Sequence, residues 1–283
     1  MKQNKEIEIL SPKLDVVFGA LFGEKGSEKI TKQFLEKILN KKIGEIDINQ
    51  NGILRREFKE EKLGTLDILA KIDKNEQCNI ELQIVDRKNI IERILYYWSR
   101  LYSRQIKVGE DYKVLEKTII ILITDYEIEE TKGLEYHSIW KIIEEKNRKL
   151  VLTNKLEIHI IEIPKIKGQE NKEDGLLDWI YFLEDPNSER VEKGMEKNKE
   201  LKEAKEKLIQ ISADERMQRI ADLRQKAIMD EKAIYDKGVD VGIERGEEKN
   251  KIEVARKLKK RNIDEEIIME ATGLTKKQLD EIM

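Results

Sequence analysis

The segments Gly64-Thr-Leu-Asp67-Ile-Leu-Ala-Lys-Ile-Asp73 and Cys78-Asn-Ile-Glu81-Leu-Gln83-Ile-Val85 decide the fold that this sequence predicts. Both are rich in apolar and β-branched residues, which is typical of strands. The polar residues 73–76 between them are typical of a turn. We therefore predict a β-hairpin over residues 64–85.

The hairpin would bring two acids close together. Alternation along the second strand puts Glu81 and Gln83 on one face, and Asp67 on the first strand lies within reach of Glu81. The two carboxylates and the backbone carbonyl of Leu82 are hard oxygen ligands of the kind that Mg²⁺ or Mn²⁺ prefers. A metal bound there could activate water and neutralise charge on a phosphate ester. The alternative is that both acids are simply solvated, although carboxylates seldom lie in apolar strands without partners.

Further blocks lie on both sides of the hairpin. A predicted helix beginning Ser11-Pro-Lys-Leu-Asp15-Val-Val-Phe18 precedes it, and a long helix ending near Gly109-Glu-Asp-Tyr112 follows. Apolar strands are predicted at residues 117–123 and 156–165. Together with Leu66-Asp67-Ile68 and Asn79-Ile-Glu81-Leu-Gln83, these blocks resemble the recombination-promoting nuclease/putative transposase (Rpn) group of the PD-(D/E)xK nuclease superfamily. The resemblance covers about residues 10–283.

This resemblance implies an α/β, restriction-endonuclease-like core with a mixed central sheet flanked by helices, followed by an all-helical C-terminal region. It also implies a Mg²⁺-dependent DNA endonuclease linked to DNA recombination, mobile elements or phage defence. Asp67 and Glu81 would bind the metal, Gln83 would position water or phosphate, and Asp15 would support the site. From the sequence alone, Asp15 is equally well explained as a helix N-terminal capping or dipole-stabilising residue.

Gln83 departs from the superfamily pattern, which has lysine at this position. Glutamine supplies neither a positive charge nor a proton, so it could only orient a water or hydrogen-bond a phosphate. The metal would then carry more of the catalysis. An alternative is a weakly active or inactive DNA-binding or assembly protein that kept the fold. A pure interaction protein is a third hypothesis.

The predicted helix over residues 89–107 carries a polar face that could track a nucleic-acid backbone. Its members recur at steps of four, three, four and three: Arg93, Tyr97, Arg100, Arg104 and Lys107. The alternative is that this charged face is merely solvated. The opposite stripe, predicted to be core, is Ile91, Leu95, Trp98 with Leu101 or Tyr102, and Val108. Gln105 lies nearer that stripe, and the family suggests that it supports the active site.

Composition limits the function further. The formal net charge is −3, so affinity for DNA must come from a local, salt-sensitive cleft. The single cysteine, Cys78, cannot form an internal disulfide, and the chain has no apolar run of membrane-spanning length. We expect a soluble, cytoplasmic protein. Only two histidines occur, and we predict that His159 faces outward from its strand, which argues against His-based zinc chemistry.

We predict three regions: a nuclease-like domain at 1–186, a long helical, self-associating region at 187–250, and a small helical unit at 251–283. Within the first, Trp140 and Trp179 are predicted core anchors. Residues 188–283 carry 23 Lys and Arg and 23 Asp and Glu. Their apolar stripe is too sparse for a stable lone helix, and Gly238, Gly242 and Gly246 recur every fourth residue. We expect homo-oligomers through these helices, with flexibility as the alternative.

Overall fold

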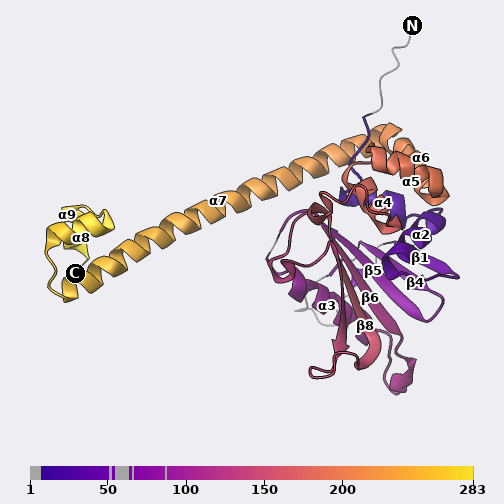
Figure 1. Ribbon diagram of the computed structural model, residues 1–283, viewed down its shortest axis with the longest axis horizontal. Helices are drawn as coiled ribbons and strands as arrows, with labels where there is room; N and C mark the ends of the chain where they lie inside the picture. Colours follow the sequence, from indigo (N-terminus) through magenta and orange to yellow (C-terminus); the bar gives the residue numbers. More distant parts are fainter. Residues whose placement is uncertain (1–7, 51–52, 55–63, 66, 87, 283) are drawn as a thin grey trace, which may run out of the picture. The chain divides into compact units, whose positions relative to one another are not determined.

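A computed structural model describes residues 8–50, 53–54, 64–65, 67–86 and 88–282 of the chain. Its centre is a six-stranded sheet in the order β1-β4-β5-β6-β8-β7 (Figure 1). The strands β5, β6 and β8 are parallel, and the other neighbouring pairs are antiparallel. The bounds are β1 Ile46–Gln50, β4 Ile68–Ile72, β5 Glu76–Gln83, β6 Lys117–Thr124, β7 His137–Ile143 and β8 Val151–Glu162. The predicted α/β fold with a mixed sheet is confirmed.

The predicted hairpin is the antiparallel pair β4 and β5, in which Ile68 lies opposite Ile80 and Ile72 opposite Glu76. Asp73 and Lys74 in the turn take positive φ angles of 50° and 65°. An Asp in this conformation hydrogen-bonds nearby backbone, which favours a turn. The short strands β2 (Ile53–Leu54) and β3 (Gly64–Thr65) form a separate two-stranded sheet.

Helix α3 (Ile90–Ser103) connects β5 to β6 and packs on one face of the sheet. Its buried residues contact alternate residues of β6 and β8, and the shared cluster contains Ile90, Ile94, Tyr97, Leu101, Ile120, Leu122, Ile158 and Ile160. The predicted core stripe of this helix was partly wrong. Leu101 is buried and Ile91 and Trp98 pack against the cluster, as predicted, but Leu95 and Val108 are exposed. Tyr97, predicted on the polar face, is buried. The helix also ends at Ser103, so Lys107 lies beyond it.

The first two predicted helices are present as α1 (Asp15–Phe18), which continues as the π-helix η1 (Gly19–Gly23), and α2 (Glu28–Leu39). They pack with α4 (Gly175–Glu184) around an aromatic cluster. Its ring centroids lie 4.9 Å apart for Phe18 and Phe22, and 5.4 Å apart for Phe34 and Trp179. Trp179 is a core anchor as predicted, but Trp140 is exposed because it lies on the edge strand β7.

His159 was also predicted wrongly. It is buried, accompanied by His137 at 2.9 Å and Glu157 at 3.0 Å, because β8 is an inner strand whose two faces are both covered.

Short 3-10 helices complete the connections: η2 Tyr112–Val114, η3 Glu129–Thr131 and η4 Ile163–Ile166.

The chain forms two compact units, Met1–Gln225 and Lys226–Met283. In the first unit, α5 (Glu189–Lys197) and α6 (Lys199–Ala213) pack against α4 and α2 respectively. Helix α7 (Glu215–Lys260) begins in the first unit and ends in the second. In the second unit it is followed by α8 (Glu265–Thr272) and α9 (Lys276–Glu281).

The second unit has a small core made by Ala255, Ile268, Leu274 and Leu279. Gly273 ends α8 at a φ of 69°, and Thr275 begins α9 with a capping box. A side chain placed at Gly238, Gly242 or Gly246 would meet nothing within 4 Å. Self-association through these helices stays a prediction.

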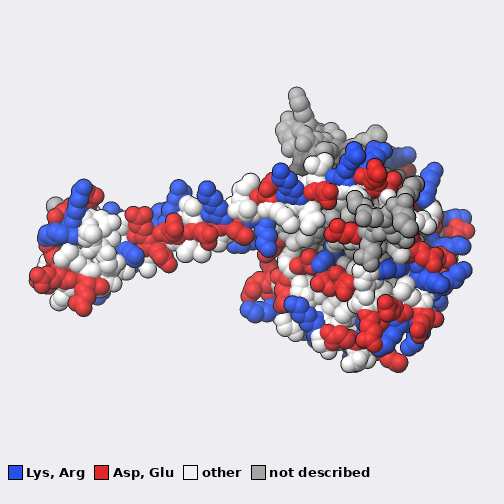
Figure 2. Space-filling view, turned by 90° about the horizontal axis from the view of Figure 1, so that it is seen from above, with Lys and Arg blue, Asp and Glu red and all other residues white. Residues whose placement is uncertain are grey.

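Positive and negative side chains are intermingled on the face of the molecule that Figure 2 presents. This agrees with the near-balance of 55 basic and 58 acidic residues. Across the described residues, no helix combines the length and the apolar character that a membrane span requires.

Candidate active site

Asp67 and Glu81 meet at one end of the β4–β5 hairpin. Asp67 immediately precedes β4, and Glu81 immediately follows Ile80, the last residue of β5 paired with β4. One oxygen of Asp67, Oδ2, accepts a hydrogen bond from the backbone amide of Leu82 at 2.8 Å. The side chain of Asp67 therefore continues the ladder between the strands, where backbone pairing has ended.

Glu81 is almost completely buried, with 1% of its surface exposed. Its Oε1 accepts a hydrogen bond from the Asn79 amide at 2.8 Å. Its Oε2 is buried and has no hydrogen-bond partner among the described residues. A buried carboxylate oxygen without a donor is costly, since the charged group has lost its water. The cation paired with this oxygen is the guanidinium of Arg93, whose Nη2 lies 3.6 Å away, too far for a hydrogen bond.

The two acids make each other's ionisation harder. Burial raises the pKa of Glu81, and the nearby charge of Asp67 raises it further. Burial also raises the pKa of Asp67, against the opposing effects of the Leu82 amide and the Arg93 charge. Close, buried carboxylates of this kind share protons unless a cation neutralises them.

Gln83, the next residue outward on the same face of β5, is tied to Arg93 of α3. The Nη1 of Arg93 donates to Oε1 of Gln83 at 3.2 Å, and its Nη2 lies 3.6 Å from Oε2 of Glu81. Its Nε donates to the hydroxyl of Tyr97 at 3.0 Å. A cation from the following helix therefore lies beside Gln83, at the position where the pattern that this sequence resembles has lysine.

Asp15, at the start of α1, lies near enough to Asp67 to raise its pKa. Both oxygens of Asp15 are engaged by Arg224 of α7, at 2.9 Å and 2.7 Å. The N-cap of α1 is Leu14, so Asp15 is not the capping residue, although its Oδ1 accepts from the adjacent amide of Val16. Sequence reasoning missed Arg224, which is 209 residues away and carries no local signal.

Lys13 brings a third cation to this end of the sheet. Its Nζ lies 2.9 Å from Oδ1 of Asp125 and 2.6 Å from Oε2 of Glu184. The backbone amide of Asp125 in turn donates to the carbonyl of Gln83 at 3.0 Å. Lys13 and Asn79 were missed as site residues, although both stand two positions from a predicted one, which was the available signal.

The predicted nucleic-acid face of α3 is only partly assembled. Arg93 reaches the acids, whereas Tyr97 is buried with its hydroxyl turned to Arg93. Arg100 is half-buried within α3, Arg104 is the exposed residue that caps its C-terminus, and Lys107 is exposed beyond it. These residues do not form one continuous helical face, and their contact with nucleic acid stays a prediction.

Gln105 does not support the acids. Its amide donates to Thr118 Oγ1 at 2.9 Å and accepts from the Glu116 amide at 2.5 Å. Thr118 lies opposite Gln77, six residues before Gln83 on β5, which corresponds to roughly 20 Å at the rise of a strand. Gln105 therefore fastens the start of β6, at the other end of the sheet.

The donor set fits a divalent, oxygen-preferring cation. In the described part of the chain, no group of three or more His, Cys, Asp or Glu is arranged to hold a metal. Mg²⁺, however, is commonly held by one or two carboxylates, with water and substrate phosphate completing its shell. Asp67 and Glu81 offer two carboxylates, and the orphaned Oε2 of Glu81 supplies a free ligand atom. The proposed ligation by the Leu82 carbonyl stays a prediction.

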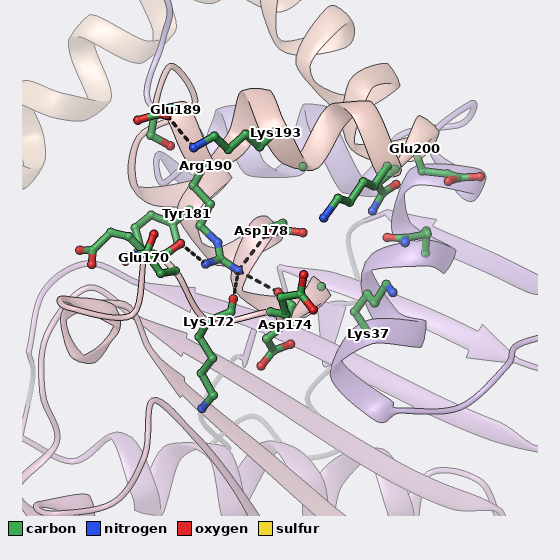
Figure 3. A pocket seen from close by; sticks show the side chains of 18 residues that line it. Lys37, Glu170, Lys172, Asp174, Asp178, Tyr181, Glu189, Arg190, Lys193 and Glu200 are labelled. Atoms are coloured by element: carbon green, nitrogen blue, oxygen red, sulfur yellow. Dashed lines mark hydrogen bonds and ion pairs between the residues drawn. The ribbon is translucent and has the colours of Figure 1, made fainter.

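A separate cleft, with a volume of about 720 Å³, lies between α2, α5 and the loop before α4 (Figure 3). Arg190 lies at its centre and donates to the carbonyls of Gln169, Glu170, Lys172 and Asp174. It also pairs with Asp178 at 2.9 Å. Both terminal nitrogens of the Arg190 guanidinium are engaged, while its buried Nε has no hydrogen-bond partner in the described part of the chain. The walls of this cleft carry both charges, so it differs from the candidate site, where two acids lie together.

Comparison with protein families gives one match: the model described as PD-(D/E)XK nuclease family transposase aligns with residues 12–238. The aligned region includes Asp15, Asp67, Glu81, Gln83 and Arg224. Searches of curated proteins and of solved structures gave no match.

Proposed function

Because this chain belongs to the PD-(D/E)XK nuclease family transposases, we propose that it is a divalent-metal-dependent DNA endonuclease. The observation that carries the proposal is the half-buried Asp67 beside the buried Glu81, with Oε2 of Glu81 left without a hydrogen-bond donor. Buried polar atoms are nearly always paired, so an unpaired carboxylate oxygen beside a second acid supports assigning Glu81 to a ligand.

Asp67 and Glu81 would hold Mg²⁺ or Mn²⁺, with the carbonyl of Leu82 as a third ligand. When bound, the metal would activate water and neutralise charge on the phosphate. The amide nitrogen of Gln83 can donate to a phosphate oxygen or to water, while its oxygen accepts from Arg93. The guanidinium of Arg93 supplies the positive charge that glutamine lacks, and Asp15 supports the site from α1.

DNA would be held by Arg93 and by the basic residues near the end of α3: Arg100, Arg104 and Lys107. Homo-oligomers would form through the C-terminal helices, and the biological setting would be DNA recombination, mobile elements or phage defence. The second candidate function is a weakly active or inactive DNA-binding protein of the same fold. It is favoured by one observation, the glutamine at position 83.

Incubation of plasmid DNA with the full-length protein and Mg²⁺ or Mn²⁺ tests the proposal. The comparison includes wild type, Asp67→Ala, Gln83→Ala, an EDTA control, and Asp47→Ala as a matched loss of an exposed acid from β1. We expect cleavage by wild type and Asp47→Ala, weak cleavage by Gln83→Ala, and none by folded Asp67→Ala or with EDTA. DNA binding without cleavage under any metal would favour the second candidate.

A further inference from the structure

Arg224 grips Asp15 with a two-pronged contact. Its Nε donates to Oδ1 at 2.9 Å, and its Nη2 lies 2.7 Å from Oδ2. Such a fork is the geometry in which arginine recognises planar carboxylates and phosphate groups alike. The contact therefore shows a guanidinium oriented to receive a pair of oxygens beside the acid cluster.

The packing of the first unit holds Arg224 in this place. Helix α6, which precedes it, packs against α2 and η1. Ser212, at the end of α6, accepts a hydrogen bond from the Leu10 amide at 3.0 Å, and Lys207 donates to Ser27 at 2.5 Å. Ala221, one turn before Arg224, is buried. The start of α7 is thus anchored to the segment that leads into α1.

The site has more acids than cations, so a further cation would lower the repulsion of a nucleic-acid strand. Asp15, Asp67 and Glu81 bring three acids together, and Arg93 offsets the charge of one of them. A nucleic-acid strand would add further negative charge. The side chain of Arg224 is 40% exposed and that of Asp15 is 36% exposed, so a phosphate approaching from solvent can reach this contact.

We propose that Arg224 is a phosphate-binding residue of this site, and that Asp15 holds its guanidinium until a nucleic-acid phosphate takes the place of the carboxylate. This inference rests on the proposed nuclease function. It assigns to the beginning of α7 a part of the substrate contact that the hairpin and α3 do not provide.

The test measures binding of a labelled DNA duplex by the full-length protein in EDTA, at several salt concentrations, so that cleavage plays no part. We compare wild type, Arg224→Gln, Arg224→Lys, Asp15→Asn and the double variant Asp15→Asn with Arg224→Gln. Arg219→Gln is the matched control, because it removes the same charge from an exposed position of the same helix.

Loss of one phosphate contact lowers the slope of log affinity against log salt by about 0.9. We expect this decrease for Arg224→Gln, and not for Arg224→Lys or Arg219→Gln. Asp15→Asn releases the guanidinium, so it should bind several-fold more tightly than wild type. That gain should disappear in the double variant, because there is no guanidinium to release.

An unchanged slope for Arg224→Gln, with wild type still binding and cleaving DNA, would overturn this inference alone. A gain from Asp15→Asn that persists without Arg224 would show general repulsion and would also overturn it. Failure of wild type to bind DNA would remove the nuclease proposal together with this one.

Discussion

Two buried glutamates on the same face of the sheet differ in how many hydrogen bonds their carboxylates accept. Glu162 at the end of β8 accepts hydrogen bonds from the Ile128 amide at 2.7 Å, the Thr131 hydroxyl at 2.8 Å and the Lys165 ammonium at 2.6 Å. Glu81 on β5 has one amide donor on Oε1 and none on Oε2. Both side chains are almost fully buried.

Glu162 is an acid that stabilises the fold, whereas Glu81 is the acid that we propose binds a metal. Glu162 binds the loop that contains Ile128 and Thr131 to the sheet. Its negative charge is paired with Lys165. Glu81 faces a second acid, and the only cation paired with it within the described residues is Arg93 at 3.6 Å. Burial alone therefore does not identify a functional carboxylate, and our proposal for Glu81 rests on its unpaired oxygen together with the neighbouring acid.

The largest expected effect is on cleavage. Replacing Glu81 by Gln should lower metal-dependent DNA cleavage about a thousandfold or more, equivalent to about 4 kcal/mol, since it removes a charged metal ligand. Glu162→Gln should cleave at the wild-type rate per folded molecule. Initial rates on supercoiled plasmid measure both, and equal losses in the two variants would break the comparison.

The second effect is on stability, and here we expect Glu162, not Glu81, to be the more sensitive position. Glu162→Gln should lower the free energy of unfolding by roughly 3 kcal/mol, because it loses an acceptor and leaves the charge of Lys165 buried without its partner. Glu81→Gln should cost nothing at neutral pH. Thermal unfolding followed by circular dichroism measures the midpoints. A larger loss in Glu81→Gln would contradict the assignment of Glu81 to a ligand.

Metal binding gives the third test. Mn²⁺ at a hundred times its dissociation constant should stabilise wild type by about 2.7 kcal/mol, because it binds the folded state only. The same addition should leave the unfolding midpoint of Glu81→Gln unchanged, while Glu162→Gln should gain as much as wild type. Equal stabilisation of all three variants would place the metal elsewhere.

The fourth test uses pH. The pKa of Glu81 is raised by burial from 4.5 to about 8, so protonated Glu81 favours the folded state. Its favourable contribution is present below pH 4.5 and is lost as the pH rises toward 8. Glu81→Gln should therefore match wild type near pH 4.5 and exceed it by roughly 2 kcal/mol above pH 8. Denaturant unfolding without metal measures this difference, and a constant difference across the range would refute it.

The smallest effect concerns Gln105. Gln105→Ala should destabilise the protein by about 1 kcal/mol, the usual value of a lost hydrogen bond, without slowing cleavage per folded molecule. Urea titration and plasmid cleavage measure the two outcomes. Loss of cleavage with full stability would restore this residue to the active site.

The sequence was sufficient for structure set by local pattern. The hairpin from β4 to β5 follows from alternation and the Asp73-Lys74 turn, and Asp67 meets Glu81 because antiparallel pairing continues from Ile68 and Ile80. The cap of α9 is equally local, because Thr275 and Gln278 lie three residues apart.

Structure set by distant partners could not be predicted. The rotation of α3 depends on how its residues meet β6 and β8, which is why Tyr97 is buried instead of Leu95. His159 alternates with apolar residues as an exposed strand residue would, yet it lies on an inner strand. The contact of Arg224 with Asp15 depends on the packing of α6, which leaves no trace near either residue.

The guanidinium of Arg190 acts as a non-covalent crosslink. It gathers four carbonyls of residues 169–174, stacks over the Tyr181 ring at 5.2 Å, and pairs with Asp178. Small domains often fasten such loops with a disulfide, but a chain with the single cysteine Cys78 cannot form one internally. The loop before α4 is therefore held by hydrogen bonds to Arg190, which reducing agents do not break. A protease that needs an extended backbone would have to displace Arg190 first.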